Sequence, residues 1–245
     1  GHFVTQTLEG YPVASFFLYK MDGIFQSPED VTNHYTEVVQ PDGSIKNIVL
    51  QPDAKPGDIR FKDLNNDGVI DENDKEYCGS GIPKLEANLS FGGSYKGVDL
   101  SFLLGSAWGH KLYNANRLYY ESMDAGINLF KSTLGAWTED NRSNVMPRAV
   151  LKDPNMNSRE SDRFLEKGNF IRLRQLQVGY TLPKNLTKKV YIDKWRFYVS
   201  GENLLTWTNY SGIDPEFSSS ILDTGVDVFI YPFTRSYVVG LQVTF

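Results

Sequence analysis

The residues with the clearest chemical spacing form an acidic loop at positions 63–74. Its oxygen-bearing side chains stand at loop positions one, three, five, nine and twelve: Asp63, Asn65, Asp67, Asp71 and Asp74. Calcium loops use this spacing because alternate side chains converge on one ion, a glycine permits the sharp turn, and the seventh residue offers its carbonyl. Gly68 and Val69 fill those last two roles. The loop therefore predicts a Ca²⁺ site, with Mg²⁺ less suited because the loop can supply many oxygen ligands.

Two features bear on how this loop would act. Asp74 stands where calcium loops usually carry a bidentate Glu, and its shorter arm would reach less far. Residues 75–86 show no helical pattern, so a helix-loop-helix sensor is not expected. A structural calcium staple in an extracellular loop is the favoured interpretation, and a metal-free acidic surface turn is the alternative.

Aromatic side chains in the long segment 109–168 could contact a ligand. They are Tyr113, Tyr119, Tyr120 and Trp137. Flat aromatic faces stack on sugar rings or on peptide side chains, but they also pack the small cores of loops. Both roles remain open for each of the four.

Composition excludes several other chemistries. The 25 Lys and Arg residues against 30 Asp and Glu residues give a net charge of −5, which does not favour nucleic-acid binding. Cys78 is the only cysteine, and His2, His34 and His110 have no spacing that pairs them with a nucleophile or a second ligand. No phosphate loop or nucleophile elbow is found, so the protein is not expected to be an enzyme.

The elements that must position these residues are strands with period-two alternation. In one segment Trp195, Phe197 and Val199 oppose Arg196 and Ser200. The segments that read as strands are 87–95, 98–108, 169–181, 194–207 and 235–245. The first two join through a tight turn at 96–97. In the third, the apolar positions change phase around Arg174 and Gln175, which predicts a β-bulge or a short paired stretch.

These strands suit a membrane better than a soluble sandwich. Each runs about 9 to 13 residues, the length that crosses a bilayer at a tilt. Aromatic residues gather at the strand ends, and connections alternate between short (96–97, 183–193) and long (109–168, 208–234), as in outer-membrane barrels. A soluble β-sandwich is the alternative, because its inner faces alternate too.

The predicted fold class is therefore all-β, an antiparallel transmembrane β-barrel segment with long extracellular loops. Five strands at about 4.8 Å spacing are too few to close a barrel. Because lipid does not tolerate an open sheet edge, further strands must complete it. We expect residues 1–86 to form an extracellular loop region with the acidic loop, and 87–245 to hold the strands and their loops.

Several segments resemble the SusC/RagA-type TonB-dependent outer-membrane transporters. They are Gly10–Pro12, Phe16–Tyr19, Asp22–Gln26, Pro56–Asn65 running into Asp67–Asp71, Tyr95–Ser101, Arg172–Pro183, Val199–Thr206 and Gly212–Glu216. The resemblance extends from about residue 8 to Phe245. Asn66 departs from it, since the family commonly has Gly there, but Asn66 is not a predicted ligand.

The resemblance implies the C-terminal part of a roughly 22-stranded barrel in the outer membrane of a Gram-negative bacterium. It implies import of oligosaccharides or peptides beneath a SusD-like surface lipoprotein, driven by the TonB complex through an N-terminal portion outside this chain. It also implies that the barrel-assembly machinery reads the terminal Phe245. The alternative function is a secreted, calcium-stabilised, β-rich glycan-binding module, whose apolar strand residues would pack inward.

Overall fold

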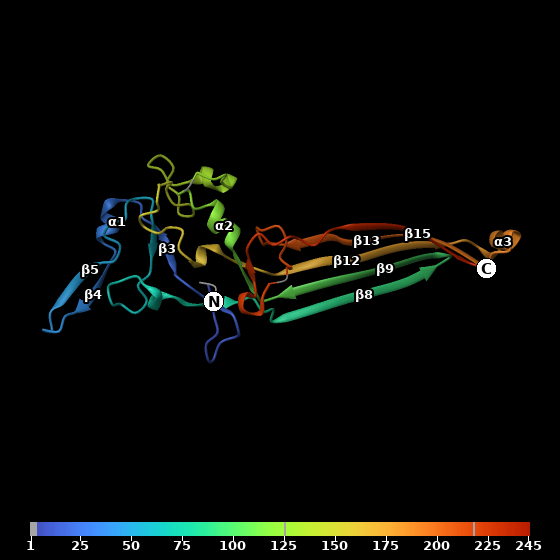
Figure 1. The fold of residues 1–245 in the computed structure, drawn as a ribbon, viewed down its shortest axis with the longest axis horizontal. Coiled ribbons are helices and arrows are strands. Elements are labelled where there is room, and N and C mark those ends of the chain that lie inside the picture. The colour runs from blue at the N-terminus through green and yellow to red at the C-terminus, as the bar shows by residue number, and fades with distance from the viewer. Residues whose placement is uncertain (1–3, 125, 218) are drawn as a thin grey trace. The chain divides into compact units, whose positions relative to one another are not determined.

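The computed structural model describes residues 4–124, 126–217 and 219–245, and strands dominate its secondary structure (Figure 1). The few helices are short, and none in the described part of the chain is long and apolar enough to cross a membrane. The chain forms two compact units. The loop unit comprises Gly1–Gly81, Tyr113–Glu166 and Ser219–Phe229; the sheet unit comprises Ile82–Leu112, Lys167–Ser218 and Ile230–Phe245.

A five-stranded antiparallel sheet makes up most of the sheet unit (Figure 1). In spatial order its strands are β15 (Ser236–Thr244), β13 (Lys194–Thr208), β12 (Phe170–Thr181), β9 (Val98–Trp108) and β8 (Leu85–Tyr95). The five segments predicted as long strands are confirmed, and each pairs with its neighbour in sequence. The short helix α3 (Lys184–Thr187) and the 3₁₀ turn η4 (Lys188–Val190) lie in the connection from β12 to β13.

The turn between β8 and β9 follows from its two residues. Lys96 and Gly97 have φ values of 49° and 88°, and two successive positive φ angles match the twist of a tight hairpin. Gly97 also lies close to β12, since a Cβ there would be 2.7 Å from the Thr181 carbonyl oxygen. A larger residue at this position would push the hairpin away from its neighbour.

The predicted bulge in β12 is confirmed. The register against β9 shifts between Leu173 and Gln175, which pair with the consecutive residues Leu104 and Leu103, so Arg174 is the extra residue on that side. Against β13 the shift is reversed: Leu173 pairs with Leu205 and Gln175 with Glu202, which leaves the extra residue in β13. Its side chain lies over Gly105 of β9, where an added Cβ would come within 2.0 Å of the Arg174 Nε. Arg174 lies on the same face of the sheet as Arg172, whose partner on β9 is Gly105, because residues two apart in a strand share a face.

The loop unit is built from short elements rather than one sheet. Its strands are β1 (Thr5–Gln6), β2 (Ser15–Leu18), β7 (Glu76–Ser80), β3 (Met21–Ile24), β6 (Ile59–Phe61), β4 (Tyr35–Val39), β5 (Ile45–Val49) and β14 (Val226–Asp227). The strands β10 (Lys111–Asn114) and β11 (Leu165–Lys167) lie at its limits, and β10 is flanked by β14 and β11. Its helical turns are α1 (Pro28–Thr32), α2 (Ala115–Tyr120), η1 (Glu72–Asp74), η2 (Lys131–Gly135), η3 (Asp162–Phe164) and η5 (Ile221–Asp223).

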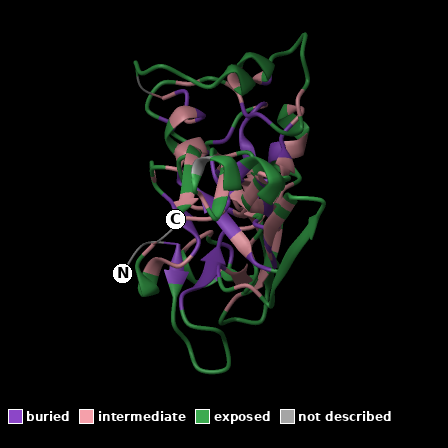
Figure 2. Cartoon of the chain, turned by 90° about the vertical axis from the view of Figure 1, so that its right-hand side faces the viewer, coloured by how far each residue is buried: buried purple, intermediate pink, exposed green. Residues whose placement is uncertain are grey.

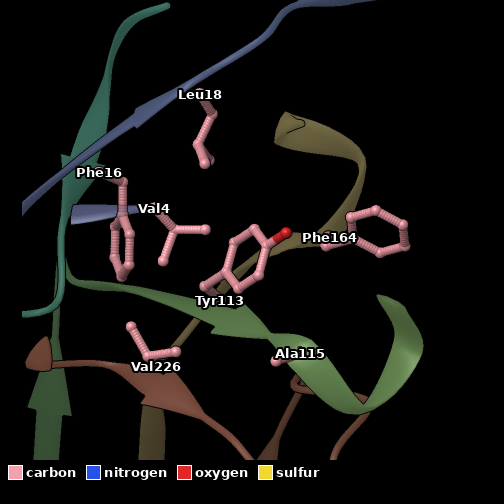
Figure 3. Close-up of a cluster of buried hydrophobic side chains, with 7 residues drawn as sticks. All are labelled: Val4, Phe16, Leu18, Tyr113, Ala115, Phe164 and Val226. Carbon is pink, nitrogen blue, oxygen red and sulfur yellow. The ribbon is translucent and has the colours of Figure 1, made fainter. Parts of the chain in front are cut away.

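The core of the loop unit joins residues from all three of its segments (Figure 3). Phe16 and Leu18 of β2 pack with Tyr113, Phe164 and Val226, and Figure 3 shows these side chains around one centre. Phe16, Leu18 and Phe164 are 0% exposed. A second cluster gathers Tyr19, Ile24, Ile59, Phe61 and Trp137.

This core decides the division of the chain. The sequence predicts a boundary between 86 and 87 with long loops beyond it, whereas the structure places most of 113–166 and 219–229 with the N-terminal region. The cluster around Phe16 takes buried side chains from all three of these segments. The segments become ordered by sharing this core.

Candidate functional site

The acidic loop connects β6 to β7 and is ordered by its own side chains. Asp63 accepts hydrogen bonds from the backbone N–H groups of Asn66 (2.7 Å) and Gly68 (3.0 Å), and Asp67 accepts one from Val69 (2.9 Å). Asn66 and Gly68 have φ values of 59° and 89°. Carboxylates that bond the backbone two to five residues ahead hold such turns.

The loop closes on Asp74, which is 0% exposed. One Asp74 carboxylate oxygen accepts from the Leu64 N–H (2.7 Å) and the other from the Asp71 N–H (2.8 Å). Asp71 in turn caps η1 by accepting from the Asn73 N–H (2.8 Å). Both ends of the loop are therefore fastened by one buried carboxylate.

This arrangement bears on the predicted metal. Within the described ranges, no group of three or more His, Cys, Asp or Glu side chains is arranged to hold a metal ion. The Asp63, Asp67 and Asp74 carboxylates accept backbone N–H groups, and each keeps further lone pairs. Calcium binding at Asp63, Asn65, Asp67, Val69, Asp71 and Asp74 stays a prediction.

The acidic loop is tied to the core behind it. Ile70 packs against the cluster around Phe61, and the Tyr19 hydroxyl donates to the Glu72 carboxylate (3.2 Å). Burial, followed by the charge of Glu72, raises the pKa of Tyr19 to about 12. The hydrogen bond from Lys75, whose Nζ lies 2.8 Å from Glu72, lowers the pKa of Glu72. The loop is therefore coupled to β2 through Tyr19.

The four predicted ligand-contacting aromatic residues lie in different surroundings. Tyr113 is 1% exposed in the core, and Trp137 is 8% exposed with its indole N–H donating to Gln26 (3.0 Å). Tyr120 packs against Phe130 with ring centroids 5.0 Å apart. Tyr119 is half exposed. The positions of Tyr113 and Trp137 favour the packing role, and ligand contact stays a prediction for all four.

The sheet has two chemically different faces. The register places Phe91, Phe102, Leu176 and Val178 on one face with their apolar neighbours, and Ser90, Ser101 and Gln177 on the other. Residues in register on the apolar face across the middle of the sheet are Leu100, Val178, Val199 and Val239. β8 is exposed along its whole length, as the burial colours indicate (Figure 2). The alternation predicted from the sequence is confirmed strand by strand.

Aromatic residues are aligned near both ends of the apolar face. At the turn end, Tyr95 and Tyr180 are both in register with Val98. At the other end, Trp108 pairs with Leu85 and Trp207 with Ile171. Aromatic rings therefore lie at both ends of the apolar face, which is the arrangement of the aromatic belts at the two membrane interfaces.

The polar face carries a four-residue ion cluster. Arg172, only 2% exposed, donates to the Asp214 carboxylate, and Arg174 donates to Glu216 (2.7 Å). Asp214 also accepts the backbone N–H of Phe233 (3.1 Å), so the cluster fastens the connection between β13 and β15. Both arginines lie on this face because residues two apart in a strand point to the same side.

The sequence carries a partial signal for this cluster. Arg172 and Arg174 are two residues apart, and so are Asp214 and Glu216, so the two arginines are expected on one face of their strand. Spacing does not tell which acidic residues they meet, because Asp214 and Glu216 lie about forty positions further along the chain. The pairing of the four residues therefore required the structure.

A second ion pair crosses the polar face near the turns. Arg196 donates through Nε to the Asp99 carboxylate (2.9 Å), and its terminal nitrogen contacts the other oxygen. The pair lies over Gly179, where an added Cβ would be 2.6 Å from both partners. Phe245, which follows β15, is 91% exposed, and its role as an assembly signal stays a prediction.

Comparison with known proteins shows what this arrangement is similar to. No protein-family model matches the chain. The chain is 29% identical over 259 residues to TonB-dependent receptor P3 of Formosa agariphila, covering all of the chain and 24% of the receptor. It is 27% identical over 199 residues to TonB-dependent receptor SusC of Bacteroides thetaiotaomicron, covering 80% of the chain and 18% of SusC.

Solved structures agree with these relatives. A chain of the RagAB peptide importer in its open-open state superposes with a TM-score of 0.67 and 25% identity, over all of this chain and 24% of that one. A second RagAB structure matches with 26% identity over 96% of this chain. The resemblance to SusC/RagA-type receptors is confirmed. The chain spans about a quarter of the length of these relatives.

Two further expectations agree with the match to SusC/RagA-type receptors. TonB-dependent receptors are proteins of the Gram-negative outer membrane, and they transport rather than catalyse. The chain shares the all-β fold with these relatives.

Proposed function

We propose that this chain is the C-terminal barrel portion of a TonB-dependent outer-membrane importer. The observation that carries the proposal is the continuous apolar face of the five-stranded sheet. Its central residues are exposed, with Phe91 at 52%, Val199 at 54% and Val239 at 82%. An exposed apolar surface of this extent is unfavourable in water, and lipid is the environment that would cover it.

The edges of the sheet support the same proposal. β8 and β15 are its outermost strands, and each presents backbone donors and acceptors outward. Because lipid supplies no hydrogen-bonding partners, further strands of the protein would pair with these edges. A barrel of roughly 22 strands, the size of the plugged transporter class, would provide them.

The connections give the sheet a direction across the membrane. β8–β9 and β12–β13 are joined by short connections at one end, and β9–β12 and β13–β15 by long ones at the other. Outer-membrane barrels have short periplasmic turns and long extracellular loops. The loop unit would then belong to the extracellular mouth, where a SusD-like lipoprotein would cover it.

The remaining parts of the proposal concern partners and substrate. One relative is named for peptide import, and SusC-type receptors extend the range to oligosaccharides, so an oligosaccharide or a peptide is the proposed cargo. The TonB complex would act through a portion outside this chain, and the barrel-assembly machinery would read Phe245. Calcium at the acidic loop would stiffen the mouth.

The alternative of a secreted, calcium-stabilised glycan-binding module is less favoured. Such a module would bury the apolar strand residues against a second layer. Instead, those residues are exposed while the loop unit has its own core. A monodisperse chain in buffer without detergent would support this alternative.

Tryptophan quenching by brominated lipid tests the proposed function directly. Trp207 lies on the apolar face and is 52% exposed, whereas Trp137 is buried in the loop unit. In lipid vesicles, a variant retaining only Trp207 should be quenched by acyl-chain bromine, and one retaining only Trp137 should not. Equal fluorescence of the Trp207 variant in brominated and ordinary lipid would contradict a lipid-facing sheet.

A further inference from the structure

A pocket of about 180 Å³ opens in the loop unit beside Tyr113. Its floor is apolar and buried, with Val4, Ala115 and Val226 at 4–5% exposure. Tyr119 on its wall is 50% exposed, so the pocket reaches the surface. Its size is close to that of apolar cavities of roughly 150 Å³ that accept one benzene ring.

The Tyr113 hydroxyl is the unusual group in this wall. Tyr113 is 1% exposed, and its hydroxyl has no hydrogen-bond partner among the described residues. Figure 3 shows the oxygen directed away from Val4 and Val226, toward the segment that carries Phe164. The hydroxyl therefore lies behind the aromatic wall, and the pocket meets the ring of Tyr113.

Burial, followed by the negative charge of Glu160, raises the pKa of Tyr113. The hydroxyl therefore keeps its proton at physiological pH and can donate or accept a hydrogen bond.

Glu160 sets the charge of the pocket. It is the one charged residue among the described residues that line it, and Tyr113 and Tyr119 add aromatic surface. A carboxylate beside aromatic rings attracts an ammonium group and repels an anion. The apolar floor offers no partners for the many hydroxyls of a sugar ring.

We propose that this pocket binds a primary ammonium compound carrying one apolar group of about six carbon atoms. Glu160 binds the ammonium group through a charge-assisted hydrogen bond, and the apolar floor contacts the side group. A free amine and the amino-terminal residue of a peptide both present this chemistry. The proposal does not depend on the transport function, because the pocket lies entirely within the loop unit.

Calorimetric titration of the whole chain, held in an amphipol so that free detergent does not compete, tests this proposal. The probes are phenethylamine, the dipeptide Leu-Gly, and neutral benzyl alcohol. Saturable binding of phenethylamine is expected, and Glu160→Gln should weaken it by about tenfold, the loss of one charge-assisted hydrogen bond. Benzyl alcohol binding should be unchanged by Glu160→Gln, and Glu37→Gln, at an exposed carboxylate, should change neither.

A second variant keeps the test independent of charge. Ala115→Leu fills the floor and should abolish phenethylamine and benzyl alcohol binding together. Leu-Gly binding in the unmodified chain would identify peptides as the source of the amine, and its absence beside phenethylamine binding would identify free amines. Lack of saturable amine binding, or an affinity unaffected by both variants, would overturn the proposal.

Discussion

The two units of this protein differ in how far their large apolar side chains are exposed. Phe91 and Val239 in the sheet unit are 52% and 82% exposed, whereas Phe16 and Phe164 in the loop unit are 0% exposed. Both units are rich in strands, so secondary structure does not explain the difference. Among the described residues, the sheet leaves its apolar face exposed, while the loop unit folds three segments around its own core. The contrast agrees with the proposed function, in which lipid surrounds the sheet and water surrounds the loops.

The units also use buried charge differently. In the loop unit, the carboxylate of the fully buried Asp58 accepts hydrogen bonds from Nε (2.7 Å) and a terminal nitrogen (3.0 Å) of Arg148. It also accepts one from the side-chain amide of Asn157 (2.9 Å). In the sheet unit, Arg172 and Asp214 fasten a connection to the polar face. The first pair holds a core together, and the second anchors a loop to a preformed sheet.

The largest expected effect comes from breaking the buried pair in the loop unit. Asp58→Ala leaves the Arg148 charge without its partner and should destabilise the loop unit by about 3–5 kcal/mol. Hydrogen exchange should show faster exchange of the Ile59 and Phe61 amides, with β12 and β13 unchanged. Asp53→Ala, at an exposed carboxylate nearby, is the control. Equal loss of protection in the sheet would mean that the two units unfold as one.

The next effect separates the two faces of the sheet. Val199 and Ser200 are neighbours in β13 on opposite faces. In lipid vesicles, Val199→Arg should destabilise the folded chain by about 2–4 kcal/mol, because an arginine near the bilayer midplane is costly. Ser200→Arg should destabilise the folded chain by well under half of that amount. Denaturant titration of the vesicle-bound protein measures both, and a reversed order would place the lipid on the other face.

Calcium should act on the loop unit alone. If the acidic loop binds the ion, calcium at about one hundred times its dissociation constant should stabilise the loop unit by about 2.7 kcal/mol. Asp67→Ala should lower the affinity without changing exchange in the strands. Calorimetry that gives neither heat nor a thermal shift would count against the predicted site.

The smallest expected effect is a pH dependence of the loop unit. His34 is half-buried, with its Nε2 2.8 Å from the Phe61 carbonyl oxygen, and burial lowers the pKa of His34 below 6.5. The contribution of His34 to the stability of the loop unit is therefore complete above about pH 6.5. It decreases as the pH falls, because His34 takes up a proton at a higher pH in the unfolded state than in the folded state. Exchange of loop-unit amides at pH 7.5 and 5.5 measures this. In His34→Gln, the part of the pH dependence due to His34 should disappear.

Much of the sheet could be predicted from the sequence because a strand needs only local information. Alternation assigns Val199 and Ser200 to opposite faces without knowledge of any partner. The change of phase at Arg174 likewise predicts the bulge. The acidic loop shows the limit of this reasoning, because its spacing does not tell that Asp63 and Asp74 accept backbone N–H groups.

The sequence by itself determined the strands, their two faces, the bulge and the family resemblance, because each rests on periodicity or on short segments. Only the tertiary structure decided that Tyr113, Phe164 and Val226 share one core, that Arg172 and Arg174 meet Asp214 and Glu216, and that a pocket opens beside Tyr113. These features join residues tens to more than a hundred positions apart. No local pattern specifies such contacts, because the chain must first fold to bring them together.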